Sequence, residues 1–312
     1  ECFELGAADY ITKPIKELVL KARVKAVIDK QMYIREISKQ QRLLAEQKAI
    51  VDEKNKNITD SIKYAKRIQE AILPEVSSLK KILPEHFILF KPRDIVSGDF
   101  YWFHQIDHRT VLAAVDCTGH GISGAFMSMI GNICLKNIVK ENPGIRANEV
   151  LNELHIQIHT LLKQDHTDNR DGMDIALVII DEQQKQLEFA GAKNPLLYFQ
   201  SGYSSKIKGD KMPIGSNWKR NQHDRHFANH VINLKSPTTI YLYSDGYQDQ
   251  FGGENHEKFM SKKLISLLEE IHQKPMNEQV QIMDNTLAQW MVMGNEPQLD
   301  DILIIGARID LG

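Results

Sequence analysis

Residues 115–127 read "VDCTGHGISGAFM", and this stretch decides how the surrounding sequence folds. Asp116 ends the apolar run "TVLAAVD", two glycines bracket His120, and the small residues that follow have helical spacing. Glycine reaches backbone conformations with positive φ that other residues avoid. The stretch therefore predicts a strand, a tight turn and a helix. A simple strand-to-helix connection explains this pattern, and so does a ligand site that needs a carboxylate beside flexible backbone.

Composition limits the classes of protein to consider. The chain has 312 residues, more than one average domain, with 42% hydrophobic and 26% charged residues, as in ordinary globular proteins. A formal net charge of -2 favours neither nucleic acid nor an anionic membrane as a partner. The longest apolar runs, such as "IALVII" at 175–180, have the length of strands, so no membrane span is predicted. Three scattered cysteines (Cys2, Cys117 and Cys134) form no zinc or disulfide pattern, which predicts a cytoplasmic protein.

Residues 16–74 are predicted to form one long helical linker, because glycine and proline are absent between Pro14 and Pro74. Apolar residues recur at intervals of seven, which is typical of one core series of a coiled coil. The second series is weaker and includes polar residues such as Gln69. So long a helix needs a partner in water, so we expect a homodimer; a single amphipathic helix folded back on its own domain is the alternative. The first series is Ile37, Leu44, Val51, Ile58, Ala65 and Ile72.

Residues 75–312 are predicted to form the main domain. Strands come in runs and helices in consecutive pairs, which favours an α+β fold of antiparallel sheets with helices grouped on their faces. "FILFKPRDIVSGDFYWF" predicts two strands around a Ser-Gly turn, and "GISGAFMSMIGNICLKNIVK" predicts a helix. The other predicted strands are "TVLAAVD", "MDIALVIID", "QLEFAGA", "PLLYFQ", "TTIYLYSDG" and "DDILIIGARI".

Aspartates stand at the ends of these predicted strands. Asp99 precedes one strand, Asp116 and Asp245 each end one, and Asp300 and Asp301 open the last. Carboxylates that converge at one sheet edge repel each other unless a cation lies between them. All-oxygen ligands suit Mg²⁺ or Mn²⁺, and two such ions can activate a water against a phosphoryl group. Because Asp-Gly pairs are also ordinary turn residues, the spacing alone leaves both interpretations open.

Six motifs in order give a more specific indication. They are "VSGDF", "VDCTGHGISGAFMS", "DGMDIALVIID", "GAKNPLLYF", "YLYSDGYQD" and "LDDILIIG". The segment that contains them, residues 87–310, resembles the bacterial metal-dependent serine/threonine phosphatases (PPM family) of the sporulation stage II and stress-response type. The resemblance implies an αββα sandwich, in which two antiparallel sheets pack together with helix pairs outside.

The resemblance also implies a site with two Mn²⁺ or Mg²⁺ ions. Asp116 would contact both ions, and the backbone carbonyl of Cys117 would join Asp99 on one of them. Asp245 and Asp300 would hold the other. Water activated there would hydrolyse phosphoserine or phosphothreonine on a partner protein, typically a phosphorylated anti-anti-sigma regulator.

Three further residues have two interpretations each. Arg93 in "KPRD" is a candidate for binding substrate phosphate or a solvated strand residue. His120 is a candidate general acid, but we favour a turn residue that caps or packs beside the next helix. Asp301 either supports the metal ligands or is a strand-opening charge.

The first residues suggest a third part. "GAADYITKPI" at 6–15 resembles the closing segment of response-regulator receiver domains. By that resemblance Lys13 would sense the phosphate, followed by Pro14, and Tyr10 would be the switch aromatic. The phosphoacceptor would lie before residue 1. We therefore expect a receiver remnant at 1–15, the linker at 16–74 and the phosphatase domain at 75–312.

Two other classes of function remain to be tested. One is a catalytically inactive dimeric signalling scaffold; the complete acidic set argues against it. The other is a two-metal nuclease, against which the near-neutral charge and the absence of a basic stripe count.

Overall fold

The computed structural model describes residues 4, 6–7, 9–11, 13–215 and 226–311. Cys2 and part of the predicted receiver remnant lie outside the described residues. The chain divides into two compact units, Glu1–Ser61 and Ile62–Gly312. Each unit is described by itself below, and the predicted boundaries at 15 and 74 remain predictions.

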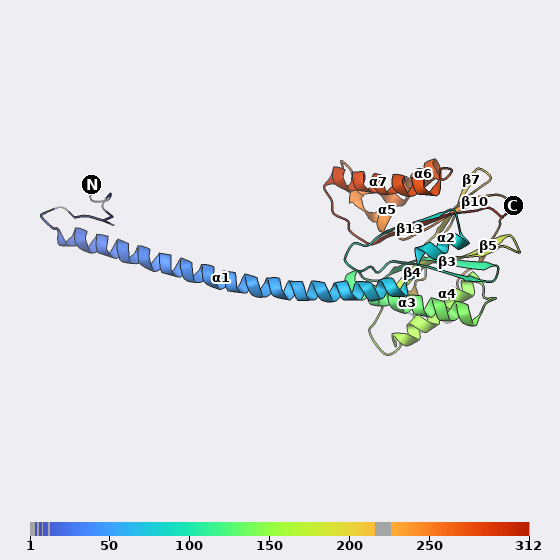
Figure 1. The fold of residues 1–312 in the computed structure, drawn as a ribbon, viewed down its shortest axis with the longest axis horizontal. Helices are drawn as coiled ribbons and strands as arrows, with labels where there is room; N and C mark the ends of the chain where they lie inside the picture. The colour runs from blue at the N-terminus through green and yellow to red at the C-terminus, as the bar shows by residue number, and fades with distance from the viewer. Residues whose placement is uncertain (1–3, 5, 8, 12, 216–225, 312) are drawn as a thin grey trace. The chain divides into compact units, whose positions relative to one another are not determined.

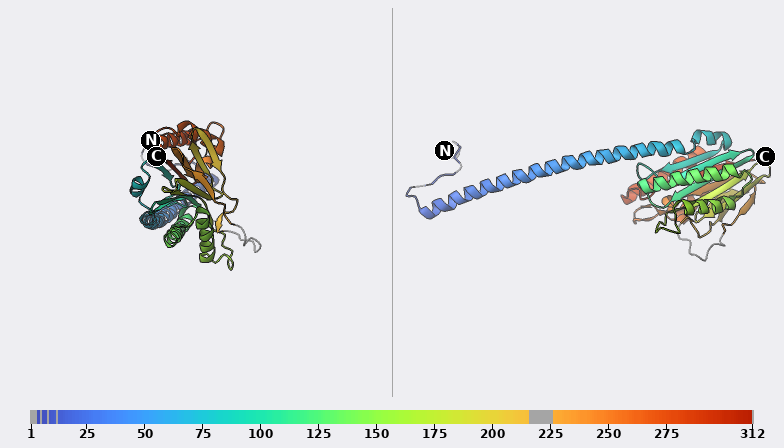
Figure 2. Two further views of the ribbon diagram at one scale, coloured as in Figure 1. Left: turned by 90° about the vertical axis from the view of Figure 1, so that its right-hand side faces the viewer. Right: turned by 90° about the horizontal axis from the view of Figure 1, so that it is seen from below.

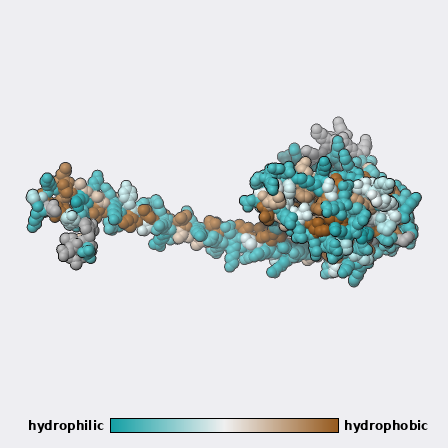
Figure 3. Space-filling model, turned by 90° about the horizontal axis from the view of Figure 1, so that it is seen from above, coloured by the Kyte–Doolittle hydropathy of each residue, from teal (hydrophilic) through white to brown (hydrophobic). Residues whose placement is uncertain are grey.

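Helix α1 spans Glu17–Ile72 and is followed at once by Leu73 and Pro74 (Figure 1). Within the first unit, every described residue of the helix is exposed or half-exposed, and apolar side chains alternate with polar ones along it (Figure 3). Leu44 and Ile58 of the predicted core series are 66% and 57% exposed. The helix is thus confirmed, and the coiled coil stays a prediction.

The second unit contains all the described strands. Its helices after α1 are α2 (Val76–Ile82), α3 (Gly121–Glu141), α4 (Ala147–Leu161), α5 (Gly246–Asp249), α6 (Met260–Ile271) and α7 (Met276–Gly294). The strands are β1 (His86–Lys91), β2 (Phe100–Ile106), β3 (Arg109–Cys117), β4 (Gly172–Asp181), β5 (Gln186–Ala192), β6 (Leu196–Gln200), β7 (Tyr203–Ile207), β8 (Ile214–Gly215), β9 (His230–Asn233), β10 (Thr238–Tyr243), β11 (Phe251–Gly252), β12 (Glu257–Lys258) and β13 (Ile302–Ile309).

Two antiparallel sheets organise these strands. One has the order β1-β13-β10-β6-β7, and the other has the order β2-β3-β4-β5-β9, with β8 pairing β4. Helices α6 and α7 lie on one side and α3 and α4 on the other (Figures 1 and 2). The predicted α+β fold of two antiparallel sheets flanked by helices is therefore confirmed.

Alternating side chains of the strands separate the core into layers. In β3, Val111, Ala113 and Val115 pack with apolar residues of α3 and α4. Leu112 and Ala114, on the other face, pack between the two sheets. A third apolar cluster joins the first sheet to α6 and α7. Because β3 is buried on both faces, its sequence is a continuous apolar run rather than an alternating one.

Two details add to the sequence prediction. The strands of "FILFKPRDIVSGDFYWF" do not form a hairpin, because β1 pairs β13 in one sheet and β2 pairs β3 in the other. Helix α3 is the one described helix long and apolar enough to cross a membrane by length and composition, although no span was predicted. Its apolar window is 56% buried, as expected of a core helix. A Cβ at Gly131 would lie 2.9 Å from Met173 Cε, so helix and sheet are in close contact there.

Candidate active site

The turn between β3 and α3 brings three backbone segments together. Gly119 and Gly121 have φ values of +83° and +62°, a region that disfavours other residues. A Cβ at Gly124 would lie 2.5 Å from the carbonyl oxygen of Gly119 and 2.7 Å from Cα of Gly98. The first turn of α3 therefore lies against the loop that carries Asp99, as the flexible backbone of the opening stretch suggested.

The predicted aspartates stand at strand ends of both sheets. Asp99 directly precedes β2, and Asp116 is the penultimate residue of β3. From the other sheet, Asp245 follows Ser244 after β10, and Asp300 lies two residues before β13. Strand ends of two packed sheets thus supply the acidic side chains.

Electrostatic interactions connect these side chains. Burial, followed by the charge of Asp116, raises the pKa of Asp99 well above its ordinary value. Burial also raises the pKa of Asp116, with further contributions from Asp245, Asp174 and Asp300. The pKa of Asp245 is raised by burial and then by Asp249, Asp300 and Asp174. We call Asp99, Asp116, Asp174, Asp245 and Asp300 the carboxylate cluster.

Asp174 is a member that sequence reasoning missed. It lies in β4 directly opposite Asp116 in the antiparallel register, so the two side chains share one face of the sheet. Burial raises its pKa, and the ammonium of Lys193, 3.0 Å from Oδ2, opposes that rise. An aspartate inside the apolar run "MDIALVIID" was the available signal.

Asp301 holds the loop that carries Asp99. Its two carboxylate oxygens accept hydrogen bonds from the backbone N–H groups of Arg93 and Gly98, each at 2.7 Å. The side chain is buried. This geometry favours the supporting interpretation of Asp301 over that of a strand-opening charge.

Divalent cations are the ligands that the oxygens of the carboxylate cluster suit. Among the described residues, no three side chains of Asp, Glu, His or Cys already form a group that could hold an ion. The donors nevertheless fit a hard cation, because they are oxygens and Asp99 Oδ2 is buried without a hydrogen-bond partner. Asp99 is buried, Asp116 and Asp245 are half-buried, and Asp300 is exposed at the edge of the cluster. The carbonyl oxygen of Cys117 faces the same loop, since a Cβ at Gly98 would lie 3.4 Å from it.

The cysteine side chains do not belong to this chemistry. Cys117 Sγ points into the apolar layer under α3, and burial raises the pKa of its thiol well above the ordinary value. Burial likewise raises the pKa of the Cys134 thiol to about 11. Neither thiol is a thiolate at neutral pH, so neither is a ready nucleophile.

Arg93 and His120 flank the loop that carries Asp99, but their side chains contact groups outside the carboxylate cluster. The Arg93 guanidinium donates to the carbonyl oxygen of Leu299 at 3.1 Å, and its Nε is 4.0 Å from Asp94. His120 stands in the turn at the N-cap position of α3, as the turn interpretation expects, but its side chain makes no capping hydrogen bond. Its Nδ1 lies 3.2 Å from Asp94 Oδ2 instead, and both side chains are exposed.

The segment before Asp300 is held in place by hydrogen bonds from Gln250 and, through it, from α7. Gln250 donates from its side chain to the carbonyl oxygen of Pro297 at 2.8 Å and accepts from the N–H of Leu299 at 3.0 Å. The indole N–H of Trp290 donates to the backbone carbonyl of Gln250 at 3.1 Å. These bonds connect α7 to the loop that leads into β13.

Gln69 is a second residue whose role the sequence did not reveal. It is the buried residue of α1, although its position in the weaker seven-residue series suggested a coiled-coil core. Its Nε2 donates to Ser97 O at 2.6 Å and to Ser128 Oγ at 2.8 Å, and its Oε1 accepts from Ser97 N at 3.3 Å. The last turns of α1 are thereby bonded to the loop of Asp99 and to α3.

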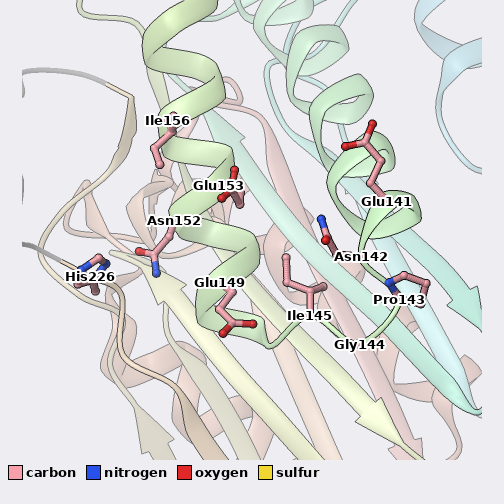
Figure 4. Close-up of a pocket in the computed structure, with 10 residues that line it drawn as sticks. All are labelled: Glu141, Asn142, Pro143, Gly144, Ile145, Glu149, Asn152, Glu153, Ile156 and His226. Atoms are coloured by element: carbon pink, nitrogen blue, oxygen red, sulfur yellow. The ribbon is translucent and has the colours of Figure 1, made fainter.

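A surface hollow lies elsewhere on the same unit. It has a volume of about 700 Å³ and lies by the turn between α3 and α4, with Glu149 and Glu153 on α4 and His226 opposite (Figure 4). It shares no lining residue with the carboxylate cluster. The site of interest is thus defined by its cluster of carboxylates and not by this hollow.

Comparison with known proteins identifies a family. Residues 106–310 match the family described as Stage II sporulation protein E (SpoIIE). The phosphoserine phosphatase RsbP of Bacillus subtilis (strain 168) is 24% identical over 196 residues, which are 62% of this chain and 46% of RsbP. The chain therefore spans about half the length of that curated relative.

Solved structures are similar as well. The SiaA-PP2C domain of Pseudomonas aeruginosa is 36% identical with a TM-score of 0.72, over 82% of this chain and 98% of that domain. The PP2C phosphatase domain of SpoIIE from Bacillus subtilis, with a fragment of its regulatory domain, shares the fold. That match has 18% identity and a TM-score of 0.57, over 72% of this chain and 63% of the other. The chain belongs to the SpoIIE family, and its second unit has the fold of a PP2C-type protein serine/threonine phosphatase domain, a class that depends on Mg²⁺ or Mn²⁺.

Proposed function

We propose that this protein hydrolyses phosphoserine and phosphothreonine on a partner protein. The observation that carries the proposal is the carboxylate cluster, in which strand ends of both sheets bring carboxylates together. Neighbouring negative charges there raise the pKa values of Asp99, Asp116 and Asp245. Such a cluster is unfavourable without a cation, because like charges in a buried site cannot all ionise cheaply. Membership of the SpoIIE family supports the same chemistry.

The proposed cofactors are two Mn²⁺ or Mg²⁺ ions. In this assignment Asp116 would contact both ions, Asp99 and the Cys117 carbonyl would hold one, and Asp245 and Asp300 would hold the other. When bound, such ions supply a water of lowered pKa and positive charge for the phosphoryl oxygens. The chain's own contribution is to fix the carboxylates: Asp301 holds the loop of Asp99 through two backbone amides. No covalent phosphoenzyme is required, in keeping with the buried thiols.

The proposed substrate is a phosphorylated regulatory protein of the anti-anti-sigma kind. The support is the name of the relative RsbP, a phosphoserine phosphatase, and the likeness to other SpoIIE-type domains. Arg93 is proposed to contact the substrate phosphate, which requires its guanidinium to leave the carbonyl of Leu299. We place the protein in the cytoplasm, with neither nucleic acid nor a membrane as its partner.

A metal-dependent assay tests the proposal. The full chain should hydrolyse an aryl phosphate and a phosphoserine peptide when Mn²⁺ is present, and both reactions should stop in EDTA. Absence of hydrolysis with either Mn²⁺ or Mg²⁺ would contradict the proposal. The catalytically inactive dimeric signalling scaffold is the second candidate. It is kept because, among the described residues, no three Asp, Glu, His or Cys side chains are already arranged to hold an ion.

We further propose that α1 regulates the site. Gln69 supports this, because it is bonded both to Ser97, two residues before Asp99, and to Ser128 of α3. A shift of the helix along or about its axis changes these bonds, and with them the position of the Asp99 loop.

The proposed homodimer forms through the exposed apolar series on α1. Ile58→Glu should convert a dimer into a monomer in light scattering and change turnover. Ala49→Glu is the matched control, because nine residues place Ala49 on the opposite face of the helix. A dimer that persists in Ile58→Glu would exclude the seven-residue series as the interface.

A further inference from the structure

A lysine lies at the rim of the carboxylate cluster. Lys193 belongs to the turn between β5 and β6, and its Nζ donates to Asp174 Oδ2 at 3.0 Å. Asp174 in turn faces Asp116 across the register of β3 and β4. The ammonium is therefore one carboxylate away from the centre of the proposed site.

The backbone of this turn is fixed in place. Lys193 has a φ of +59°, a conformation that is uncommon for a residue with a side chain. Its N–H donates to Asp210 O at 2.7 Å, and the N–H of Asn194 donates to Ala192 O at 2.7 Å. A Cβ at Gly191 would lie 2.4 Å from Asn194 O, so only glycine fits there. Unfavourable backbone conformations persist where the surroundings enforce them, often at binding sites.

The exposure of the two partners suits a contact with an incoming ligand. The side chain of Lys193 is 49% exposed, whereas that of Asp174 is 23% exposed. The ammonium is thus open to solvent on one side and bonded to the cluster on the other. An ordinary surface ion pair has both partners in water and contributes little to stability.

The charge of the cluster favours such a group. Five ionised carboxylates carry one more negative charge than the two proposed divalent ions neutralise, and a cation at the entrance offsets the remaining repulsion of a phosphoryl dianion. Arg93, the other candidate, directs its guanidinium at the carbonyl of Leu299. Lys193 is held at the cluster by a carboxylate and not by a backbone carbonyl, and three rotatable N–H donors let it bind a second anion.

We propose that Lys193 is a phosphate-binding residue of this site, whose ammonium Asp174 holds where it meets the phosphoryl group of the phosphoserine or phosphothreonine substrate. The inference rests on the proposed function and adds to it a residue that contacts substrate. Lys193 makes and breaks no covalent bond. It binds the phosphoryl oxygens in the ground state and in the transition state alike, so its main effect is on KM.

Two lysines at opposite ends of β5 provide a matched test. Lys193 directly follows the strand and Lys185 directly precedes it, and both have positive φ and exposed side chains. In Lys193→Met, the KM for a phosphoserine peptide and the Ki for inorganic phosphate should both rise about tenfold or more, as expected for a lost charge-assisted hydrogen bond. The kcat should change less than about threefold. Lys193→Arg should recover part of the loss, and Lys185→Met should behave as wild type.

Calorimetric titration of the Mn²⁺-loaded full chain with inorganic phosphate separates this inference from the proposed function. If wild type hydrolyses nothing while Lys193→Met still weakens phosphate binding, the proposed function fails and the role of Lys193 stands. Unchanged phosphate affinity in Lys193→Met, or a loss confined to Mn²⁺ affinity, overturns the inference, because the lysine then only orders Asp174. Lys193→Asn replaces the methionine variant if that variant does not fold, since asparagine tolerates this backbone conformation.

Discussion

In the layer under α3 and α4, Leu151 and Leu154 are fully buried among other apolar side chains. At the end of β3, which contributes to the same layer, neighbouring carboxylates raise the pKa of Asp116, and the buried Asp99 Oδ2 has no hydrogen-bond partner. The first region stabilises the fold by removing apolar area from water. The second opposes folding, because buried like charges cost free energy. The contrast indicates that stability and activity can be changed separately, and in opposite directions.

The largest expected effect is on the activity of Asp116→Asn. Turnover should fall at least about a hundredfold, since loss of the residues that merely orient metal ligands already costs 10–100-fold. In EDTA the variant should melt no lower than wild type, because one buried charge is gone. Mn²⁺-dependent turnover and thermal melts measure the two effects.

Asp107→Asn is the control for that variant, because Asp107 lies in the turn at the far end of the β2–β3 pair and has a positive φ that asparagine accepts. Near wild-type turnover in folded Asp116→Asn would remove Asp116 from the proposed site.

The core should respond in the opposite way. Leu151→Ala removes a fully buried side chain of α4 and should lower the free energy of unfolding by about 2–5 kcal/mol. Turnover per folded molecule should stay near that of wild type. Urea unfolding and an assay corrected for the folded fraction measure this; equal losses of stability and activity would show that the two regions are not separable.

Gln69→Leu tests the contact of the end of α1 with the loop of Asp99 and with α3. It leaves the carbonyl of Ser97 and the hydroxyl of Ser128 without this partner, at a cost of about 1–3 kcal/mol. The loop of Asp99 should loosen, so Mn²⁺ affinity should fall while Glu70→Leu, an exposed change in the same turn, leaves it unaltered. Calorimetric titration with Mn²⁺ decides; equal affinity in both variants would make Gln69 a purely structural residue.

The smallest effect is a difference in pH dependence. The pKa of Asp116 is raised in the folded state, so the folded chain binds protons more readily than the unfolded chain. Stability from this group is complete below the ordinary carboxyl pKa near 3.9 and is lost as pH rises through the raised value. In EDTA, wild type should lose stability relative to Asp116→Asn as pH increases from about 4 to 7.

Melting curves across that range measure the difference, where 1 kcal/mol corresponds to about 2–4 °C. Parallel curves for wild type and Asp116→Asn would show that Asp116 is not electrostatically strained.

Local patterns in the sequence predicted the elements and most of the candidate site. Asp99, Asp116, Asp245 and Asp300 were recognisable because each stands next to a strand end beside a turn signal. Asp174 was not, because its proximity to Asp116 depends on the register of β3 and β4, which no local pattern specifies. Gln69 was read as a polar coiled-coil position, since an amide on a regular helix looks the same whichever surface buries it.

The bond from Trp290 to Gln250 gives the molecule an optical reporter. The indole is stacked edge-on against Phe259, with ring centroids 5.3 Å apart, and Lys263 Nζ lies 4.1 Å above its ring. Gln250 in turn holds the loop that leads to Asp300. A displacement of that loop changes the field at the indole, and so the wavelength of its emission. The chain has three tryptophans, so a variant in which Trp102 and Trp218 are replaced by phenylalanine would read the state of the Asp300 side of the site from Trp290 alone.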